Sequence, residues 1–290
     1  MVAYHLSMLT AADLIQFQKD GYLILTNYLS PDEIATARKQ ITSIIDGFDP
    51  SKVSVFSTTD HSLTSTAYFI DSASQISCFF EEAAFDQHGQ LTQAKELSIN
   101  KIGHALHDLD PVFHDISYKK ELAVICQQLN MKEPLIVQSQ YIFKQPGIGG
   151  KVAPHQDSTF IYTDPPSCLG FWIALEDATL ENGCLMAIPG SQQSDLGSLR
   201  FVRNAQGTET FFVGEPGPAG DLDQMVPLEV ESGSLIILHG ALIHMSTPNC
   251  SSHSRHAYVL HLVDAQAHWS TDNWLQRPDN FPFRRLNQYI

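Results

Sequence analysis

The chain is short of basic residues. It has 17 lysines and arginines against 32 aspartates and glutamates in 290 residues, which gives a formal net charge of −15 and an isoelectric point near 5.1. Nucleic acids and anionic membrane surfaces bind through basic patches, so this composition disfavours both as partners. It also argues against a coenzyme A thioester as the substrate, because the phosphates of that group need cationic side chains.

Cysteine pairs and long apolar runs are missing as well. The five cysteines are an odd number, lie far apart and form no CxxC motif, which is typical of free thiols and excludes a disulfide framework. No apolar run reaches the length of a membrane span. The N-terminus does not read as a signal peptide and the C-terminus does not match a peroxisomal signal. We therefore expect a cytoplasmic protein.

The order of the predicted elements indicates the fold class. Capped helical patterns occupy residues 10–20 and 30–47, whereas the later two thirds is rich in short strands separated by turns. There is no internal repeat and no linker. We predict one domain over residues 1–290 that is mainly β with supporting α-helices: a helical N-terminal support over about 7–130 and a double-sheet jelly-roll core over about 135–265.

A candidate metal site begins at the stretch Ala153–Asp157. In an extended segment alternate side chains project to the same side, so His155 and Asp157 converge on one point. A facial triad of two histidines and one carboxylate needs one more histidine and leaves three positions of iron open. By itself the His-x-Asp pattern is a weak signal.

The third ligand and an anion-binding residue follow in the last third of the chain. An apolar strand over residues 233–239 ends at His239, and His244 lies just beyond it, so the residues alone leave two candidates. Arg255 opens another strand, where alternation places it on the face of Ala257 and Val259. An arginine on an apolar face needs an anion, and guanidinium binds a carboxylate through two hydrogen bonds.

In this order His155, Asp157, His244 and Arg255 resemble the Fe(II)- and 2-oxoglutarate-dependent oxygenases, and within them the phytanoyl-CoA dioxygenase family. The segments 181–185 and 189–191, and the pattern His244-x-Ser246-x-x-Asn249, fit that family. Gln192 departs from it, since many members have histidine there, but that position is not a metal ligand. The resemblance covers about residues 14–274 and implies a double-stranded β-helix, a cupin-like jelly roll.

The resemblance also implies roles. His155, Asp157 and His244 would hold Fe(II), and 2-oxoglutarate and O2 would take the open positions, with ascorbate as reductant. Arg255 would bind the distal carboxylate of 2-oxoglutarate. Further cosubstrate contacts would come from Lys101, Gln140, Trp172 and Ser246. From the residues alone, Lys101 reads equally well as a snorkelling lysine, Gln140 as a core-edge amide and Trp172 as core.

The implied reaction decarboxylates 2-oxoglutarate to succinate and CO2 and hydroxylates a small organic substrate, which the acidic composition predicts is not a CoA thioester. Two alternatives remain: a non-catalytic binding or sensing protein that keeps the fold, and a zinc-dependent hydrolase, which has no need of Arg255. His104 and His107, three residues apart, are not expected to bind metal. We interpret residues 191–228 as a lid or specificity loop. The oligomeric state stays open.

Overall fold

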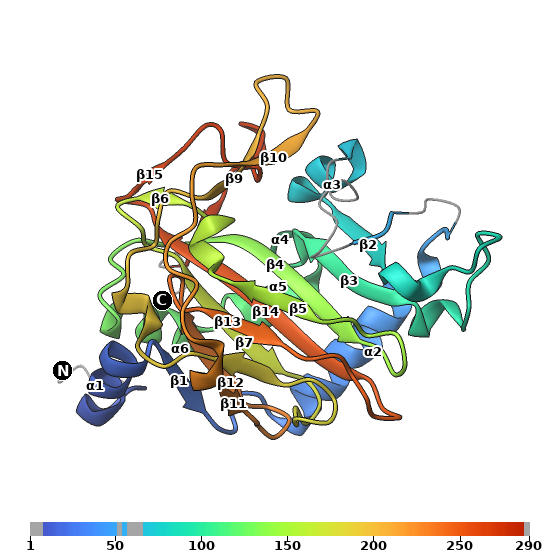
Figure 1. Cartoon of the computed structure of the whole chain (residues 1–290), viewed down its shortest axis with the longest axis horizontal. Coiled ribbons are helices and arrows are strands. Elements are labelled where there is room, and N and C mark those ends of the chain that lie inside the picture. The colour runs from blue at the N-terminus through green and yellow to red at the C-terminus, as the bar shows by residue number, and fades with distance from the viewer. Residues whose placement is uncertain (1–7, 51–53, 57–65, 287–290) are drawn as a thin grey trace.

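The computed structural model of the chain describes residues 8–50, 54–56 and 66–286 (Figure 1). The helices are α1 (Ala11–Asp20), α2 (Pro31–Gly47), α3 (Ala67–Asp71), α4 (Leu106–Leu109), α5 (Pro111–Ser117) and α6 (Lys120–Gln128). The first two begin as the sequence predicts, with capping boxes formed by Thr10 with Asp13 and by Ser30 with Glu33.

Most strands belong to one large and one small antiparallel sheet. The large sheet has the order β1-β12-β7-β14-β4-β3-β2, with β16 also paired to β4, and the small sheet has the order β11-β8-β13-β5. The strands of the large sheet are β1 (Tyr22–Leu25), β2 (Ile76–Phe80), β3 (Ile99–His104), β4 (Pro134–Lys144), β7 (Leu169–Ala174), β12 (Leu235–His239), β14 (Arg255–Asp264) and β16 (Arg284–Arg285). Those of the small sheet are β5 (Val152–His155), β8 (Leu185–Ala187), β11 (Val226–Leu228) and β13 (His244–Ser246).

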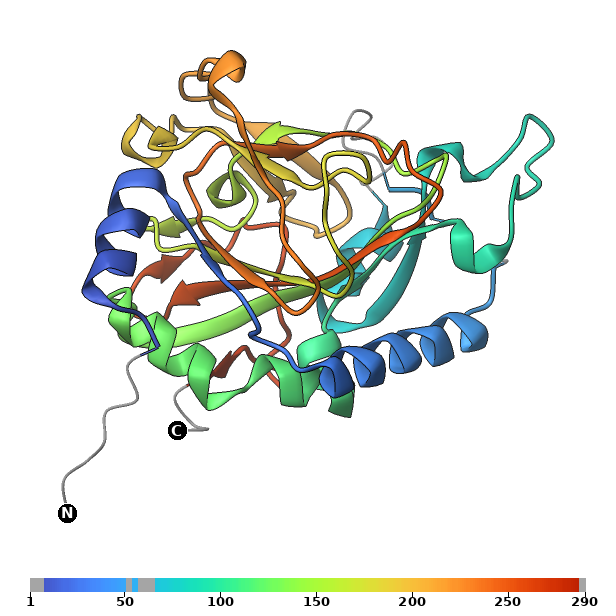
Figure 2. The same ribbon diagram turned by 90° about the horizontal axis from the view of Figure 1, so that it is seen from below.

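The two faces of the large sheet have different partners. On the outer face, side chains such as Tyr141, Phe171 and Tyr258 join a core with residues of α2, α5 and α6, and these helices lie along one side of the sheet (Figure 2). On the inner face, Trp172 and Val259 pack with apolar residues of the small sheet. Strand alternation therefore divides each strand between a helix-facing side and a side that faces the other sheet.

This architecture confirms the predicted jelly roll with supporting helices. The first 130 residues contribute strands β1, β2 and β3 to the large sheet as well as helices. Residues 191–228 are more ordered than a loop: they hold a hairpin of β9 (Arg200–Arg203) and β10 (Thr210–Val213) and then strand β11. A further short pair joins β6 (Thr163–Asp164) to β15 (His268–Trp269).

Two sequence expectations concern absences. All five cysteines are unpaired thiols, and only Cys250 is exposed. Among the helices of the described residues, none is both long and apolar enough to span a bilayer.

A buried ion cluster ties the C-terminal segment to the helical layer. The carboxylate of Asp108, at α4, lies 3.3 Å from Arg277 and 3.3 Å from Arg284, and 3.1 Å from the ring of His107. Burial opposes ionisation of Asp108, but His107 and Arg277 together lower its pKa. The pair of Asp108 and Arg277 is almost fully shielded from solvent, so neither charge tolerates the loss of its partner.

We expect Asp108→Asn to lower the free energy of unfolding by about 3–5 kcal/mol, because Arg277 would keep a buried charge without its carboxylate. Asp115→Asn is the control, since Asp115 is exposed, and should change the free energy by less than about 0.5 kcal/mol. Denaturant titration measures both. The lowered pKa means that the contribution of Asp108 is present above its unfolded pKa of about 3.9 and is lost as the pH falls through the folded value. Equal stability of the two variants would contradict this role.

Candidate metal centre and cosubstrate site

The small sheet brings three potential metal ligands together. His244, at the start of β13, pairs directly with His155, at the end of β5, and their ring centroids are 4.3 Å apart. Asp157 opens a short 3-10 turn after β5, and its Oδ1 lies 3.6 Å from His155 Nε2 and 3.7 Å from His244 Nε2. One ligand atom from each residue lies within 4.8 Å of the others, close enough for one metal ion.

The hydrogen bonds of the two imidazoles suit metal binding. His155 Nδ1 lies 2.9 Å from the carbonyl oxygen of Ala153, and His244 Nδ1 lies 3.0 Å from that of Leu242. Because a carbonyl oxygen only accepts, each Nδ1 must donate, which leaves the lone pair of the neutral ring on Nε2. Such bonds fix the tautomer and orientation of metal-binding histidines. Burial opposes protonation of His155, yet Asp157 raises its pKa, so a metal ion at this site would compete with a proton for that lone pair.

The charge states of Asp157 and His244 also suit metal binding. Burial opposes ionisation of Asp157, yet His261 and His244 hold its pKa well below the usual range. Burial and the neighbouring His155 lower the pKa of His244 to about 4. At neutral pH the cluster thus offers an ionised carboxylate and a neutral His244, which are the forms that bind a cation.

His239 lies elsewhere. Its ring is 6.2 Å from that of Phe17 in α1, and its Nδ1 accepts a hydrogen bond of 3.1 Å from the backbone N–H of Ala241. It borders a pocket of about 340 Å³ beside α1. The structure therefore places His244, and not His239, next to His155 and Asp157.

Arg255 is a buried cation with unused donors. It starts β14 on the inner face and is 2% exposed, and its Nε and Nη1 have no hydrogen-bond partner among the described residues. Its guanidinium carbon lies 5.1 Å from the ring centre of Trp172. Burial lowers the pKa of Arg255 to about 10, so it stays charged at neutral pH. Buried guanidinium without an acceptor is costly, and a ligand carboxylate would satisfy it.

The other predicted cosubstrate residues share the inner face. Val259 of β14 is the cross-strand neighbour of both Gln140 in β4 and Trp172 in β7, so these side chains form one row. Trp172 is buried and Gln140 is half-buried. Ser246 is buried two residues after His244 on β13 and so projects to the same side. Their contact with a cosubstrate remains a prediction.

Lys101 has an aromatic environment. It lies in β3 opposite Ile142, and its Nζ is 3.2 Å from the ring centre of Phe56. The ring centres of Phe69 and Phe79 lie 5.9 and 5.8 Å from the same atom. Burial lowers the pKa of Lys101 well below the usual range. Lys101 forms no ion pair within the described parts of the chain. An anion bound at this end of the inner face would therefore contact an amine that is already shielded from water.

His104 and His107 do not form a pair on one helix face. His104 ends β3 and lies 2.7 Å from the hydroxyl of Ser72, whereas His107 belongs to α4 and lies 2.7 Å from that of Ser139. Each histidine thus has its own buried hydroxyl partner.

One residue of the site, His261, was not predicted from the sequence. His261, on the inner face of β14, places its Nε2 3.4 Å from Asp157 Oδ1, the same oxygen that His155 and His244 approach, and its Nδ1 has no partner among the described residues. It lies six residues after Arg255 in one strand, so alternation alone could have indicated that both face inward. Its cross-strand neighbour Gly170 leaves room for the carboxylate.

Aromatic side chains border the cluster on the side of the β9–β10 hairpin. The ring of Phe160 is 5.9 Å from His155, and it also contacts Phe201 at 5.6 Å and Phe212 at 5.8 Å. Phe201 packs in turn against Trp274 and Phe69 of α3. This wall gives the site an apolar surround.

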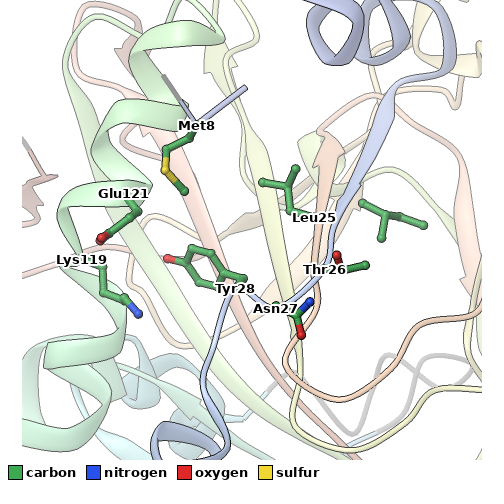
Figure 3. Close-up of a pocket in the computed structure, with 8 residues that line it drawn as sticks. Met8, Leu25, Thr26, Asn27, Tyr28, Lys119 and Glu121 are labelled. Atoms are coloured by element: carbon green, nitrogen blue, oxygen red, sulfur yellow. The ribbon is translucent and has the colours of Figure 1, made fainter. Parts of the chain in front are cut away.

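A pocket of about 490 Å³ lies apart from these residues. Figure 3 shows it between the end of β1 and the start of α6, with Tyr28 and Lys119 among its lining side chains. None of the candidate site residues lines this pocket.

Known structures share the fold. The non-heme α-ketoglutarate-dependent carbocyclase SnoK from nogalamycin biosynthesis has a TM-score of 0.63 at 16% identity, over 95% of this chain and 96% of its own. EctD from S. alaskensis with bound Fe has a TM-score of 0.61 at 21% identity, over 93% and 82%. These neighbours show that the chain shares their overall fold.

Sequence comparison identifies the family. The family model described as Phytanoyl-CoA dioxygenase (PhyH) matches residues 17–257. The chain is 52% identical over 270 residues to phytanoyl-CoA dioxygenase 1 of Oryza sativa subsp. japonica, covering 93% of this chain and 94% of the relative. It is 41% identical over 291 residues to phytanoyl-CoA dioxygenase domain-containing protein 1 of Danio rerio, covering 97% and 99%. The chain therefore belongs to the phytanoyl-CoA dioxygenase family and is a dioxygenase enzyme.

Gly170→Ala tests the carboxylate's position in the metal centre. An added Cβ would lie 2.8 Å from Asp157 Oδ2, and the central strand β7 holds the backbone in place, so the carboxylate must move. We expect metal affinity to fall about 10- to 100-fold, as for other changes that shift a ligand. Gly47→Ala is the control, because nothing lies within 4 Å of its added Cβ. Titration with Mn(II), followed by electron paramagnetic resonance, measures both, and unchanged affinity in Gly170→Ala would refute the assignment.

Proposed function

We propose that the chain is an Fe(II)- and 2-oxoglutarate-dependent dioxygenase that hydroxylates a small organic substrate. The proposal rests on one observation: two different sites lie on the inner faces of the two sheets. One is a cluster of two imidazoles and one carboxylate. The other is the buried guanidinium of Arg255, whose Nε and Nη1 lack acceptors among the described residues. A cosubstrate that binds metal at one end and carries a carboxylate at the other would satisfy both.

The residues present fit iron. The ligand set of His155, Asp157 and His244 is the two-histidine, one-carboxylate type that non-heme Fe(II) oxygenases use, and it leaves coordination positions open. Zinc in a hydrolase would use the same atoms, but such an enzyme has no use for the unpaired Arg255. A non-catalytic binder would not need open metal positions.

When bound, iron with 2-oxoglutarate and O2 supplies an oxidation that yields succinate and CO2 and places hydroxyl on a substrate C–H group, with ascorbate as the proposed reductant. The chain's part is to bind and orient. Arg255 and Ser246 would hold the distal carboxylate of 2-oxoglutarate, Trp172 and Gln140 would flank it, and the amine of Lys101 would add a further contact. The aromatic wall at Phe160 would exclude water from the reacting side of His155.

Turnover of 2-oxoglutarate to succinate under air, with Fe(II) and ascorbate, tests the reaction. We expect the wild type to form succinate and His244→Ala to lose this activity, because the metal would lose one of three protein ligands. His239→Ala is the matched control: it removes the neighbouring histidine outside the cluster and should retain a rate close to that of the wild type. Succinate from His244→Ala at the wild-type rate would overturn the assignment of the metal ligand. No succinate from the wild type would favour the hydrolase or binding alternative.

We further propose that the substrate is small or apolar and carries no CoA group. The wall nearest His155 is made of phenylalanines, and Arg200 of the adjoining hairpin is already paired with Asp272 at 2.5 Å. The names of the plant relatives favour the alternative, phytanoyl-CoA itself. A CoA substrate would need cationic side chains for its phosphates.

Phytanoyl-CoA added to the same assay separates the two substrates. We expect it to leave the rate of succinate formation at the uncoupled level, whereas a fitting apolar substrate raises that rate several-fold by completing the site. The products are checked by mass spectrometry for an added oxygen atom. Stoichiometric hydroxylation of phytanoyl-CoA with succinate formation would show that the proposal on the substrate is wrong and would leave the reaction class intact.

A further inference from the structure

Lys144 is a second buried cation beside Arg255. It ends β4, is 2% exposed, and is the direct cross-strand neighbour of Arg255 in β14. Two like charges opposite each other in a sheet destabilise it. Burial and the charge of Arg255 lower the pKa of Lys144 to about 7. A basic side chain that is buried opposite Arg255 destabilises the sheet, so its local contacts should show what it does there.

The ammonium group of Lys144 bridges two segments that lead into the metal centre. Its Nζ donates to the carbonyl oxygen of Thr247 at 2.6 Å and to that of Gly150 at 2.8 Å. Thr247 directly follows Ser246 on the strand that carries His244. Gly150 lies just before β5, the strand that ends at His155. One side chain of the large sheet thus holds the segment that follows β13 and the segment that precedes β5 in the small sheet.

Two glycines leave a slot for this side chain. A Cβ added at Gly183 would lie 2.6 Å from Lys144 Cδ, and one added at Gly149 would lie 2.9 Å from Lys144 Cγ. Gly183 belongs to the segment 181–185 and Gly149 to the loop that follows β4. The chain therefore keeps both positions free of side chains where the aliphatic stem of Lys144 passes.

The backbone of Lys144 is held as well. Asn249 is buried and donates from Nδ2 to the carbonyl oxygen of Lys144 at 2.7 Å and to that of His253 at 2.7 Å. The backbone N–H of Asn249 donates to the carbonyl oxygen of Gly149 at 3.0 Å. The turn between Thr247 and Arg255 is thereby joined to the end of β4 through side chain and backbone together.

The charges around this position favour an incoming anion. Arg255 is cationic, Lys144 is partly protonated at neutral pH, and the buried Glu81 raises the pKa of Lys144. Burial raises the pKa of Glu81 itself to about 7, against hydrogen bonds from Asn100 and Gly150 and the charge of Lys144. The full charge of Arg255 and the partial charge of Lys144 therefore face one carboxyl group that is only partly ionised at neutral pH, and this excess of positive charge would attract a ligand carboxylate at Arg255.

We propose that Lys144 is a positioning residue for the cosubstrate: by holding Thr247 and Gly150 it sets Ser246 and Arg255 at the geometry that binds a carboxylate. The inference rests on the proposed function, because it takes 2-oxoglutarate as the ligand. Lys144 reaches the ligand through the backbone it holds and through its field, and is not itself a catalytic group.

Binding of 2-oxoglutarate to the Mn(II)-loaded chain under argon tests this role without turnover. Trp172, 5.1 Å from Arg255, provides a fluorescence signal. We expect Lys144→Met to raise the dissociation constant of 2-oxoglutarate about tenfold or more while the affinity for Mn(II), measured separately by electron paramagnetic resonance, stays within about threefold of the wild type. Lys39→Met is the control for loss of an exposed lysine, on α2, and should change neither.

Lys144→Gln is measured in parallel, because it keeps an amide donor without the charge and carries the test if the methionine variant does not fold. An increase in the dissociation constant smaller than for Lys144→Met supports positioning by the donated hydrogen bonds. A lowered melting temperature with unchanged 2-oxoglutarate affinity in both variants would overturn the proposal and leave Lys144 a purely structural residue. Loss of Mn(II) and 2-oxoglutarate affinity in parallel would also overturn it. Failure of the wild type to bind 2-oxoglutarate would instead refute the proposed function, and the role of Lys144 with it.

Discussion

The antiparallel pairing of β13 with β5 is the constraint on which the candidate site depends. It sets His244 opposite His155, and because the side-chain period of a strand is two, a slip of one residue would turn His244 and Ser246 to the other side. Both strands are short, so their own hydrogen bonds hold the register weakly. Pairing of β13 with β8 on its other edge, and the bridge from Lys144 to Thr247, supply the remaining restraint.

Strand β14 links the stability of the fold to the site. Its outward side chains, Tyr258 and Leu260 among them, are fully buried against the helical layer, whereas Arg255 and His261 face the small sheet. All ten residues of β14 pair with β4 on one side, and residues 257–262 pair with β7 on the other. A buried cation is costly, and here the apolar contacts of the same strand on its opposite face hold it in place.

Features that depend on local sequence pattern, such as helix caps and strand faces, could be predicted. Features that depend on which strands pair could not. Alternation from residue 255 onward correctly put Arg255 on the face of Val259, and the helix caps at Thr10 and Ser30 were readable from residue types. The choice between His239 and His244 was not, because it depends on which strand pairs with β5. His261 belongs to no motif, and its contact with Asp157 depends on how β14 packs against the turn after β5. Asp157 reaches the cluster from a 3-10 turn, not from the extended strand that alternation assumed.

The acidic composition and the cationic interior together suggest how the site selects its ligands. Among the described residues, the basic side chains of Lys101, Lys144 and Arg255 are buried at inner-face positions of the large sheet, while Asp157 is the acid of the metal cluster. Most of the 32 acidic residues are not buried. A small dicarboxylate that enters between the sheets exchanges water for fixed cations, whereas a large polyanion would keep most of its charge outside, against an acidic surface. Charge separation of this kind would suit the proposed cosubstrate, 2-oxoglutarate, better than a CoA thioester.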